Sequence, residues 1–320
     1  EKFGDCHAEV NALKNCSENP IDSDLYVNLE PCSYFGKTPP CVDEIISNSI
    51  KNVYIGSKDP NDKVNGKGIE ILKQAGINVF TDILAKECYE LNIGFFNWIN
   101  TSKPWVIAKV AQSKDGFIGK TSSERTIITG PDSRMEVHGL RAKVDAVLIG
   151  SNTAKIDNPK LTVRDVSGNN PIRIVLDTFR QLPLNLNIFT DNKSKTITIY
   201  SKNNFVKSKT TFCEYLTVDL MKNDNEKELN FLDPLNILQV LGEYGITSLM
   251  IEGGKKVLNS FMNNNLIDEI HLYTSNRVIG ESKLDNPLTI DEDWELLTEK
   301  TFENDVLKVL RKKELCLQEL

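Results

Sequence analysis

The sequence predicts an α/β fold in two domains. Short strand-like runs alternate with helix-like segments along the chain, which is the pattern of layered α/β proteins. The length of 320 residues suggests about two domains. The stretch Asn100–Pro104 has turn composition and no hydrophobic periodicity, so we place the domain boundary there and expect domains at 1–102 and 103–320.

Composition, charge and cysteine usage favour a globular protein of a reducing, cytoplasmic setting. Hydrophobic residues make up 40% of the chain and charged residues 26%, as is usual for globular domains. The net charge of −7 argues against broad attraction to nucleic acid or anionic membranes. No apolar run resembles a membrane span or a signal peptide. Seven scattered cysteines, an odd number, do not suggest a disulfide framework and fit a reducing compartment.

The elements of the first domain follow from apolar spacing and from proline and glycine signals. Val10 and Leu13 lie on one side of a short helix. Two prolines precede a helix start at Cys41, and Gly76 closes a later helix. The expected helices are 8–14, one from Cys41, 69–74 and 84–92, and the expected strands are 25–29, 53–55 and 77–80.

The second domain begins with a run that predicts a buried strand, Trp105–Ala111. It is apolar except for Lys109, and a lysine inside a strand needs a partner or a purpose. Asp132 is a suitable N-cap for a helix that continues to about Lys143. Further expectations are a turn at 115–116, strands at 144–149, 172–177, 196–200, 266–274 and 302–310, a strand that ends at Glu252 before a helix, and a solvated charged loop at 223–228.

Residues 6–41 contain the residue types of a catalytic zinc site. His7, Cys32 and Cys41 offer one imidazole and two thiolates, and a catalytic zinc usually has three protein ligands and one open position. Glu9 lies two residues beyond the histidine, where a carboxylate can carry protons without binding the metal. Zinc in such a site makes hydroxide available near neutral pH. Zinc-dependent base deaminases use these residue types, although two residues separate the cysteines in their pattern and eight do so here.

A closed structural zinc site with Cys6 as the fourth ligand is the alternative. Cys6 adjoins His7, and neighbouring residues rarely both face one metal without strain. Such a site would also have no use for Glu9, so we favour the catalytic interpretation. Because a deaminase sheet needs strands before this first helix, we expect that an N-terminal segment, and part of the first active site with it, is missing from the sequence.

Three other features bear on possible site residues, and the first two allow two interpretations each. Lys37 is either a point charge for a phosphate or an ordinary solvated lysine. The pair Gly253-Gly254 precedes a helix start, where the backbone can approach a phosphate, but such pairs also only make turns. The three spaced glycines of the Rossmann fingerprint are absent, so a standard Rossmann domain is not expected. His138, one of three histidines, is expected at the surface or at a helix end, without a catalytic part.

Several runs of the first domain match one enzyme family. They are His-Ala-Glu-Val-Asn-Ala-Leu from His7, Leu-Glu-Pro-Cys-Ser from Leu29, Gly-Lys-Thr-Pro-Pro-Cys from Gly36, Asp59-Pro-Asn, Gly66-Lys-Gly and Leu91-Asn-Ile-Gly-Phe-Phe. These runs resemble the bifunctional deaminase–reductase family of riboflavin biosynthesis. The resemblance implies a cytidine-deaminase-like three-layer α/β/α domain, truncated at its N-terminus, that deaminates a diaminopyrimidinone with a phosphoribosylamino group. It also implies that His7, Cys32 and Cys41 bind Zn²⁺, that Glu9 shuttles protons and that Lys37 contacts the substrate.

The second domain is similar to the reductase of the same family. The matches are Lys109, Ser113, Asp115-Gly116, Thr129, Arg141, Thr153, Asp157-Asn-Pro, Leu161-Thr-Val-Arg164 and Ile251-Glu-Gly-Gly254. They imply a dihydrofolate-reductase-like α/β domain in which NADPH reduces the ribosyl group of the deaminated product to ribityl. Lys109 would be the proton donor. The implied substrate residues are Arg125, Arg141, Leu161, Arg164 and Glu252, and the implied NADPH residues are Ala111, Ile127, Thr153, Asp157, Thr178, Gly253, Gly254, Lys255 and Lys256.

Three positions depart from the family pattern and leave alternatives open. Tyr34 replaces a substrate-contacting histidine, Ile127 a tryptophan that lines the cofactor, and Arg125 a substrate-contacting serine. Alternatives are therefore an enzyme with only one of the two activities, a zinc-dependent nucleoside or tRNA deaminase, and a zinc-dependent nucleic-acid-binding module. The second domain and the net charge, respectively, oppose the last two. The resemblance also implies small-molecule substrates and a homo-oligomer, either a dimer or a tetramer.

Overall fold

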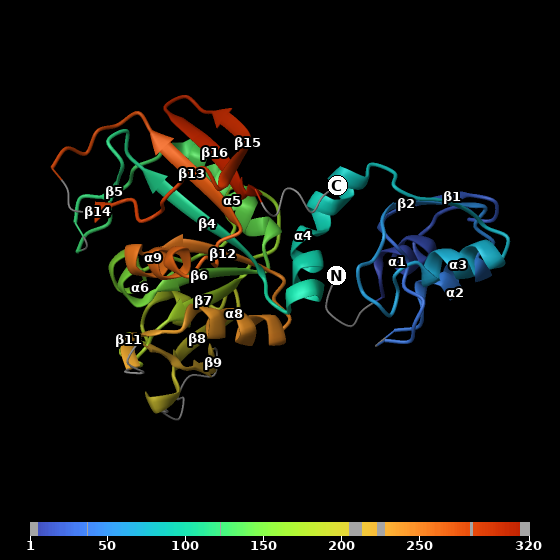
Figure 1. Cartoon of the computed structure of the whole chain (residues 1–320), viewed down its shortest axis with the longest axis horizontal. Coiled ribbons are helices and arrows are strands. Elements are labelled where there is room, and N and C mark those ends of the chain that lie inside the picture. Colours follow the sequence, from blue (N-terminus) through green and yellow to red (C-terminus); the bar gives the residue numbers. More distant parts are fainter. Residues whose placement is uncertain are drawn as a thin grey trace. The chain divides into compact units, whose positions relative to one another are not determined.

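The computed structural model divides the chain into two compact units between Thr101 and Ser102 (Figure 1). It describes residues 6–36, 38–121, 123–204, 213–222, 228–281 and 284–313. Lys37 and all but the last residue of the expected charged loop at 223–228 lie outside the described residues. None of the described helices has both the length and the apolar character that crossing a membrane requires.

The first unit is built on three parallel strands in the order β1-β2-β3. The expected elements are present, with boundaries shifted by a few residues. The strands are β1 (Asp24–Leu29), β2 (Asn52–Ser57) and β3 (Asn78–Phe80), and the helices are α1 (Ala8–Lys14), α2 (Cys41–Ser47), α3 (Lys67–Gln74) and α4 (Ala85–Thr101).

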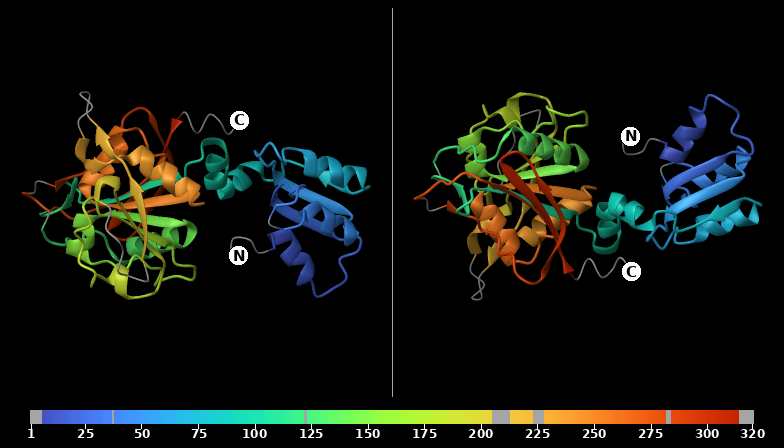
Figure 2. Two further views of the ribbon diagram at one scale, coloured as in Figure 1. Left: turned by 90° about the horizontal axis from the view of Figure 1, so that it is seen from below. Right: turned by 90° about the horizontal axis from the view of Figure 1, so that it is seen from above.

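Helices cover both faces of this sheet (Figure 2), which confirms the three-layer prediction. Val53 and Ile55 of β2 point to one face and pack in a core with residues of α2 and α3. Gly56 points to the other face, where a Cβ atom would lie 2.2 Å from the Sγ atom of Cys88 in α4. This glycine therefore allows α4 to pack directly on the strand. The expected end of that helix at residue 92 is wrong, because apolar residues such as Phe96 continue at helical spacing to Thr101.

The second unit contains a nine-stranded sheet in the order β15-β16-β13-β4-β12-β6-β7-β8-β9. Its strands from β13 to β9 run parallel, and β16 and β15 are antiparallel to their neighbours. The strands are β4 (Trp105–Gln112), β6 (Ala146–Gly150), β7 (Ile172–Leu176), β8 (Thr196–Ser201), β9 (Cys213–Val218), β12 (Ser248–Gly253), β13 (Glu269–Ser275), β15 (Trp294–Thr301) and β16 (Asp305–Lys312).

Helices and short strand pairs complete this unit. The helices are α5 (Pro131–Lys143), α6 (Ser151–Asp157), α7 (Asn187–Thr190), α8 (Pro234–Glu243) and α9 (Lys255–Asn263), with a 3₁₀ turn at Lys202–Asn204, and the short pairs join β5 (Phe117–Gly119) to β14 (Leu284–Asp285) and β10 (Leu220–Lys222) to β11 (Glu228–Leu232).

The parallel strands place their carboxyl ends along one edge of the sheet. Gln112, Gly253, Gly150 and Leu176 are the last residues of four adjacent strands, β4, β12, β6 and β7. Ligands of open α/β sheets bind outside these ends. A ligand site of this unit is therefore expected among the segments that follow β4, β6, β7 and β12.

The helix α5 is capped from a distant strand rather than by its own sequence. The expectation that Asp132 caps this helix is wrong, because the N-cap residue is Gly130 and Asp132 lies in the first turn. The buried Asp305 carboxylate accepts hydrogen bonds from the Gly130 backbone at 2.7 Å and from the Ser133 hydroxyl at 2.6 Å. Asp305, which begins β16, thus ties the start of α5 to the second strand of the sheet.

Replacing Asp305 by alanine is expected to lower the free energy of unfolding by about 1–3 kcal/mol, because two donors lose a buried acceptor. The midpoint of urea unfolding, followed by the fluorescence of the second unit's tryptophans, measures the effect. Glu303→Ala, at an exposed carboxylate two residues earlier, is the matched control and should change stability by less than about 0.5 kcal/mol. Equal effects of the two substitutions would contradict the cap.

Candidate active sites

The three expected zinc ligands converge in the first unit. The Nδ1 atom of His7 lies 3.4 Å from the Sγ atom of Cys32 and 3.2 Å from that of Cys41. All three ligand atoms lie within 4.8 Å of one another. Zn–N and Zn–S bonds of about 2.0 and 2.3 Å put the ligand atoms of one tetrahedral ion roughly 3.5 Å apart. The donor set and its spacing therefore fit one zinc ion.

Local structure explains why these ligands meet. His7 is the N-cap residue of α1, Cys32 follows the end of β1, and Cys41 is the first residue of α2. The Cys41 amide donates to Cys32 Sγ at 3.3 Å, which holds the two thiols together across the intervening loop. The interaction with the Cys41 thiol lowers the pKa of Cys32 to about 6, so a thiolate forms there near neutral pH.

Cys6 does not belong to the converging set. Its Sγ atom accepts a hydrogen bond from Lys14 Nζ at 3.4 Å. Among the described residues, the group of potential metal ligands at this place contains only His7, Cys32 and Cys41. Three protein ligands leave a position for a water molecule or a substrate, so the arrangement fits a catalytic zinc better than a closed structural one.

Glu9 lies beside these ligands, in the first turn of α1. The pKa of Cys41 is raised chiefly by its interaction with Cys32 and by burial, and the nearby Glu9 carboxylate raises it further. A carboxylate that interacts with a ligand's sulfur atom is within reach of a group bound in the open position. Its place suits proton transfer, as the spacing His-Ala-Glu predicts.

The buried Glu30 carboxylate supports the zinc ligands and was not singled out in the sequence. It accepts hydrogen bonds from the backbone amides of Gly66 at 2.9 Å, Ile69 at 3.3 Å and Asp59 at 3.4 Å. It thereby joins the segment before Cys32 to residues 59–69. Two matching runs, Asp59-Pro-Asn and Gly66-Lys-Gly, hinted at this contact, but neither indicates which side chain it binds.

A cavity of about 640 Å³ lies in the second unit, at the carboxyl ends of β6, β7 and β12. A Cβ atom on Gly254 would lie 2.9 Å from the Thr153 hydroxyl, so glycine is needed where α9 starts beside α6. The residues expected to contact NADPH that line the cavity are Thr153, Asp157, Thr178, Gly254, Lys255 and Lys256, and Arg125, expected at the substrate, lines it too.

Three residues expected to contact NADPH are not among those that line this cavity. Ala111 packs against a cluster of Val137, Tyr273 and Leu307 instead. Ile127, which replaces a tryptophan of the family pattern, is 58% exposed. Gly253 precedes the lining residue Gly254.

Arg125 lies near Asp157 at the edge of the same cavity. Burial raises the pKa of Asp157, and the positive charge of Arg125 partly offsets this. The pair places one cation and one anion on the cavity wall. A residue expected at the substrate is therefore close to a residue expected at the cofactor.

A buried ion pair occupies the adjacent end of β12. The Arg141 guanidinium binds both oxygens of the Glu252 carboxylate, with its Nη2 atom 2.6 Å from Oε2. The two side chains are 11% and 9% exposed. Burial alone would raise the pKa of Glu252, but Arg141 outweighs it and holds that pKa below its usual range. Arg141 was expected to bind substrate, and in the structure its guanidinium binds Glu252; contact with the substrate stays a prediction.

Lys109 lies beside this pair, partly buried on β4. Burial lowers its pKa, the Glu252 carboxylate opposes that shift, and Arg141 adds to it. Its Nζ atom lies 5.8 Å from the centre of the Tyr273 ring. A lysine with a lowered pKa gives up its proton more readily than one in water, which suits a proton donor near neutral pH.

His138 is buried in the middle of α5 and contacts Arg164, so the expectation that it lies at the surface or at a helix end is wrong. That it has no catalytic part stays a prediction. The residue is 4% exposed, and its Nε2 atom lies 3.2 Å from Arg164 Nη2. The loop that carries Arg164 covers this face of α5, 26 residues further along the chain. Helical periodicity within α5 does not predict such a contact. Arg164 itself is exposed, whereas Leu161 is 3% exposed.

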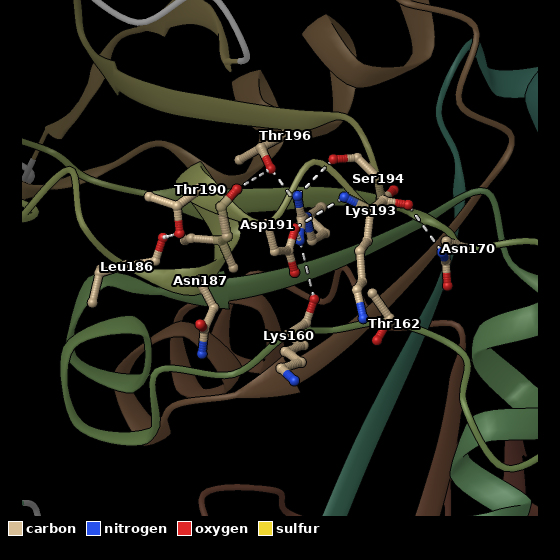
Figure 3. Close-up of polar contacts among 12 residues, drawn as sticks. Lys160, Thr162, Asn170, Leu186, Asn187, Thr190, Asp191, Lys193, Ser194 and Thr196 are labelled. Carbon is tan, nitrogen blue, oxygen red and sulfur yellow. Dashed lines mark hydrogen bonds and ion pairs between the residues drawn. The ribbon is translucent and has the colours of Figure 1, made fainter.

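The loop that carries Leu161 and Arg164 is anchored by the buried Arg173. Its guanidinium donates to the Lys160 carbonyl at 3.3 Å and to Asp191 at 2.6 Å. Figure 3 shows these acceptors together with Ser194 and Thr196, which accept the remaining hydrogen bonds of the same guanidinium. This buried arginine, through four hydrogen bonds, thus connects the loop to β7 and β8. Sequence reasoning assigned Arg173 only to a strand.

Both units match models of known families. Residues 3–57 match the cytidine and deoxycytidylate deaminase zinc-binding region. Residues 104–308 match the RibD C-terminal domain. The first match includes the three converging ligands and Glu9, and the second includes every residue expected at the reductase site.

Relatives and solved structures resemble the chain over most of its length. It is 39% identical to the riboflavin biosynthesis protein RibD of Aquifex aeolicus (strain VF5) over 282 residues, which are 88% of this chain and 77% of the relative. The structure of a diaminohydroxyphosphoribosylaminopyrimidine deaminase / 5-amino-6-(5-phosphoribosylamino)uracil reductase from Thermotoga maritima is 30% identical, with a TM-score of 0.80, and covers 97% of this chain and 86% of that one. Acinetobacter baumannii RibD is also 30% identical, with a TM-score of 0.82 and coverage of 98% and 87%.

Proposed function

Because this chain belongs to the RibD family of bifunctional riboflavin-biosynthesis enzymes, we propose that its two predicted domains, 1–102 and 103–320, perform deamination and reduction in turn. The enzyme is a zinc-dependent hydrolase and an NADPH-dependent oxidoreductase that acts on small molecules. The proposed first substrate is the diaminopyrimidinone with a phosphoribosylamino group, and the second is the resulting phosphoribosylaminouracil. The observation that carries the proposal is the convergence of His7, Cys32 and Cys41 beside Glu9.

In the proposed deamination, His7, Cys32 and Cys41 hold zinc, which as a Lewis acid supplies hydroxide at neutral pH. Glu9 would take the first proton of the water and give it to the ring nitrogen, and would then pass the proton of the added hydroxyl group to the departing amino group, so that ammonia leaves and a carbonyl remains. Lys37, which lies outside the described residues, is proposed to contact the substrate as a cation. Glu30 holds the segment before Cys32 in place through backbone hydrogen bonds.

In the proposed reduction, the cavity beside α6 and α9 binds NADPH. Thr153, Asp157 and Thr178 line it, together with Gly254, Lys255 and Lys256 at the start of α9. Helix N-termini present amides to phosphate groups, and the two lysines add positive charge. Ala111, Ile127 and Gly253 stay predictions from the resemblance.

The proposed substrate position lies next to the Arg141–Glu252 pair. Arg141 orients the Glu252 carboxylate, which would contact the substrate, and Lys109 would donate a proton to it. Bound NADPH would supply the hydride for the ribose carbon. Arg164, exposed on its loop, is better placed than Arg141 to bind the phosphate, since no carboxylate of the described residues binds its guanidinium. Arg125 and Leu161 complete the proposed substrate contacts. A dimer or tetramer and a cytoplasmic location also stay predictions.

Both activities can be tested in one assay. The purified full-length protein is given the diaminopyrimidinone and NADPH, and ammonia release and nicotinamide absorbance are followed together. We expect both signals, the second dependent on the first. Removing zinc with a chelator, or replacing Cys32 by serine, should abolish ammonia release but leave NADPH oxidation intact when the aminouracil is supplied directly. The exposed Cys16, replaced by serine, is the matched control.

Three outcomes would contradict the proposal in different ways. Loss of only one signal in the wild-type protein would indicate an enzyme that retains one activity. Full ammonia release after complete zinc removal would overturn the role of the three ligands. Equal loss in the Cys16 and Cys32 variants would show that the effect comes from a general disturbance of the first unit.

A further inference from the structure

The contact between His138 and Arg164 has no role in the function proposed so far. The ring is buried on α5, and its Nε2 atom lies 3.2 Å from Arg164 Nη2. The second terminal nitrogen of the guanidinium, Nη1, donates to the Thr162 hydroxyl at 3.1 Å. Arg164 sits on a loop without regular secondary structure, so these two contacts decide where its guanidinium points.

The protonation state of His138 decides whether this contact exists. An arginine only donates hydrogen bonds, so the ring must be neutral, with a lone pair on Nε2. Burial lowers the pKa of His138, and the positive charges of Arg141 and Arg164 lower it further, whereas the carboxylates of Asp165 and Glu252 raise it. The net direction favours the neutral ring. A protonated Nε2 would instead donate to Asp165 Oδ2, at 3.3 Å.

The second ring nitrogen supports the same assignment. In a neutral ring that accepts through Nε2, the proton lies on Nδ1. That atom is buried and has no hydrogen-bond partner among the described residues. An unpaired buried N–H group costs stability, and a ring kept only for packing could be replaced by an apolar side chain without that cost. The atom that distinguishes His138 from an apolar side chain is therefore Nε2, the acceptor of the hydrogen bond from Arg164.

We propose that His138 is a positioning residue of the reductase site: its neutral ring accepts a hydrogen bond from Arg164 and holds that guanidinium for the substrate's phosphate. The inference rests on the proposed function, in which Arg164 binds this phosphate. Because a guanidinium recognises phosphate through two parallel hydrogen bonds, its orientation matters as well as its charge. His138 acts through Arg164 and does not need to touch the substrate.

The test compares His138→Leu, which removes the acceptor, with His138→Gln, whose amide oxygen can replace Nε2. Steady-state reduction of the phosphoribosylaminouracil gives KM and kcat for each variant. For His138→Leu we expect KM for this substrate to rise roughly tenfold, because a hydrogen bond to a charged group is lost. We expect kcat and KM for NADPH to change little, and His138→Gln to recover most of the loss.

The His138→Leu substitution is then made in the Arg164→Met variant, which lacks the guanidinium. If His138 acts through Arg164, adding His138→Leu to Arg164→Met should not raise KM further. The proposal is overturned if the leucine substitution raises KM by the same factor in both backgrounds, if glutamine is as harmful as leucine, or if neither changes KM. An unchanged KM for NADPH and an unchanged midpoint of urea unfolding, followed by the fluorescence of the second unit's tryptophans, report whether the second unit of each variant is folded. A wild-type protein that does not oxidise NADPH with this substrate would overturn the proposed function instead.

Discussion

Replacing Glu9 by glutamine is expected to lower the rate of ammonia release by about 10²–10⁴-fold, the usual contribution of a positioned acid–base group. Glutamine keeps the shape of the side chain and removes the group that accepts and returns the proton. The zinc ligands His7, Cys32 and Cys41 are untouched, so bound zinc should remain at one ion per chain. NADPH oxidation with the aminouracil substrate should also be unchanged, because that reaction belongs to the other unit.

Zinc analysis and the two separate assays check this expectation. Glu18→Gln, at an exposed carboxylate outside α1, is the matched control and should release ammonia like the wild-type protein. If the Glu9 variant loses its zinc, Glu9 stabilises the metal site, and the role of proton carrier is wrong. Full activity without Glu9 would have the same consequence.

Replacing Lys109 by methionine is expected to lower kcat of the reductase by at least about 10²-fold. Methionine fills similar space, and the Glu252 carboxylate keeps its bidentate partner Arg141, so the substitution leaves no buried charge unpaired. The loss should therefore come from the missing proton donor rather than from unfolding. Lys308→Met, on β16 and 48% exposed, is the matched control.

The pH dependence of the wild-type reductase provides a second measurement for Lys109. A proton donor works only while it is protonated, so kcat is highest below its pKa and falls as the pH rises through it. Because burial lowers the pKa of Lys109, this fall should occur at a lower pH than the ordinary lysine value of 10.5 predicts. Normal turnover by the methionine variant, or a kcat that rises through this range, would exclude Lys109 as the donor.

The zinc centre was accessible from the sequence because residue type and short spacing define most of it. His7 and Glu9 are two positions apart at the start of a helix, and proline precedes both ligand cysteines. The prediction that three ligands serve one ion required only that a loop bring Cys32 and Cys41 together. The support from Glu30 could not be predicted, because its acceptor oxygens bind backbone amides 29 to 39 residues away.

Regular elements were found where the hydrophobic period was clear and missed where it was not. The buried strands β6 and β7 are continuous apolar runs and were expected close to their observed positions. The edge strand β15 is exposed along almost its whole length, so its sequence shows no apolar alternation. The helix α8 was also missed, although Asp233 and Pro234 are a typical N-cap and first helical residue.

By itself, the sequence determined the residue types of both sites, the order of strands and helices around them, and the two-domain α/β class. Only the tertiary structure decided which charged side chains face each other: Arg141 with Glu252, His138 with Arg164, and Asp305 with the start of α5. The physical reason is that a buried charge or imidazole is stabilised by a partner from a distant element. Local periodicity records which face of an element is apolar, but it carries no information about the group that will lie opposite.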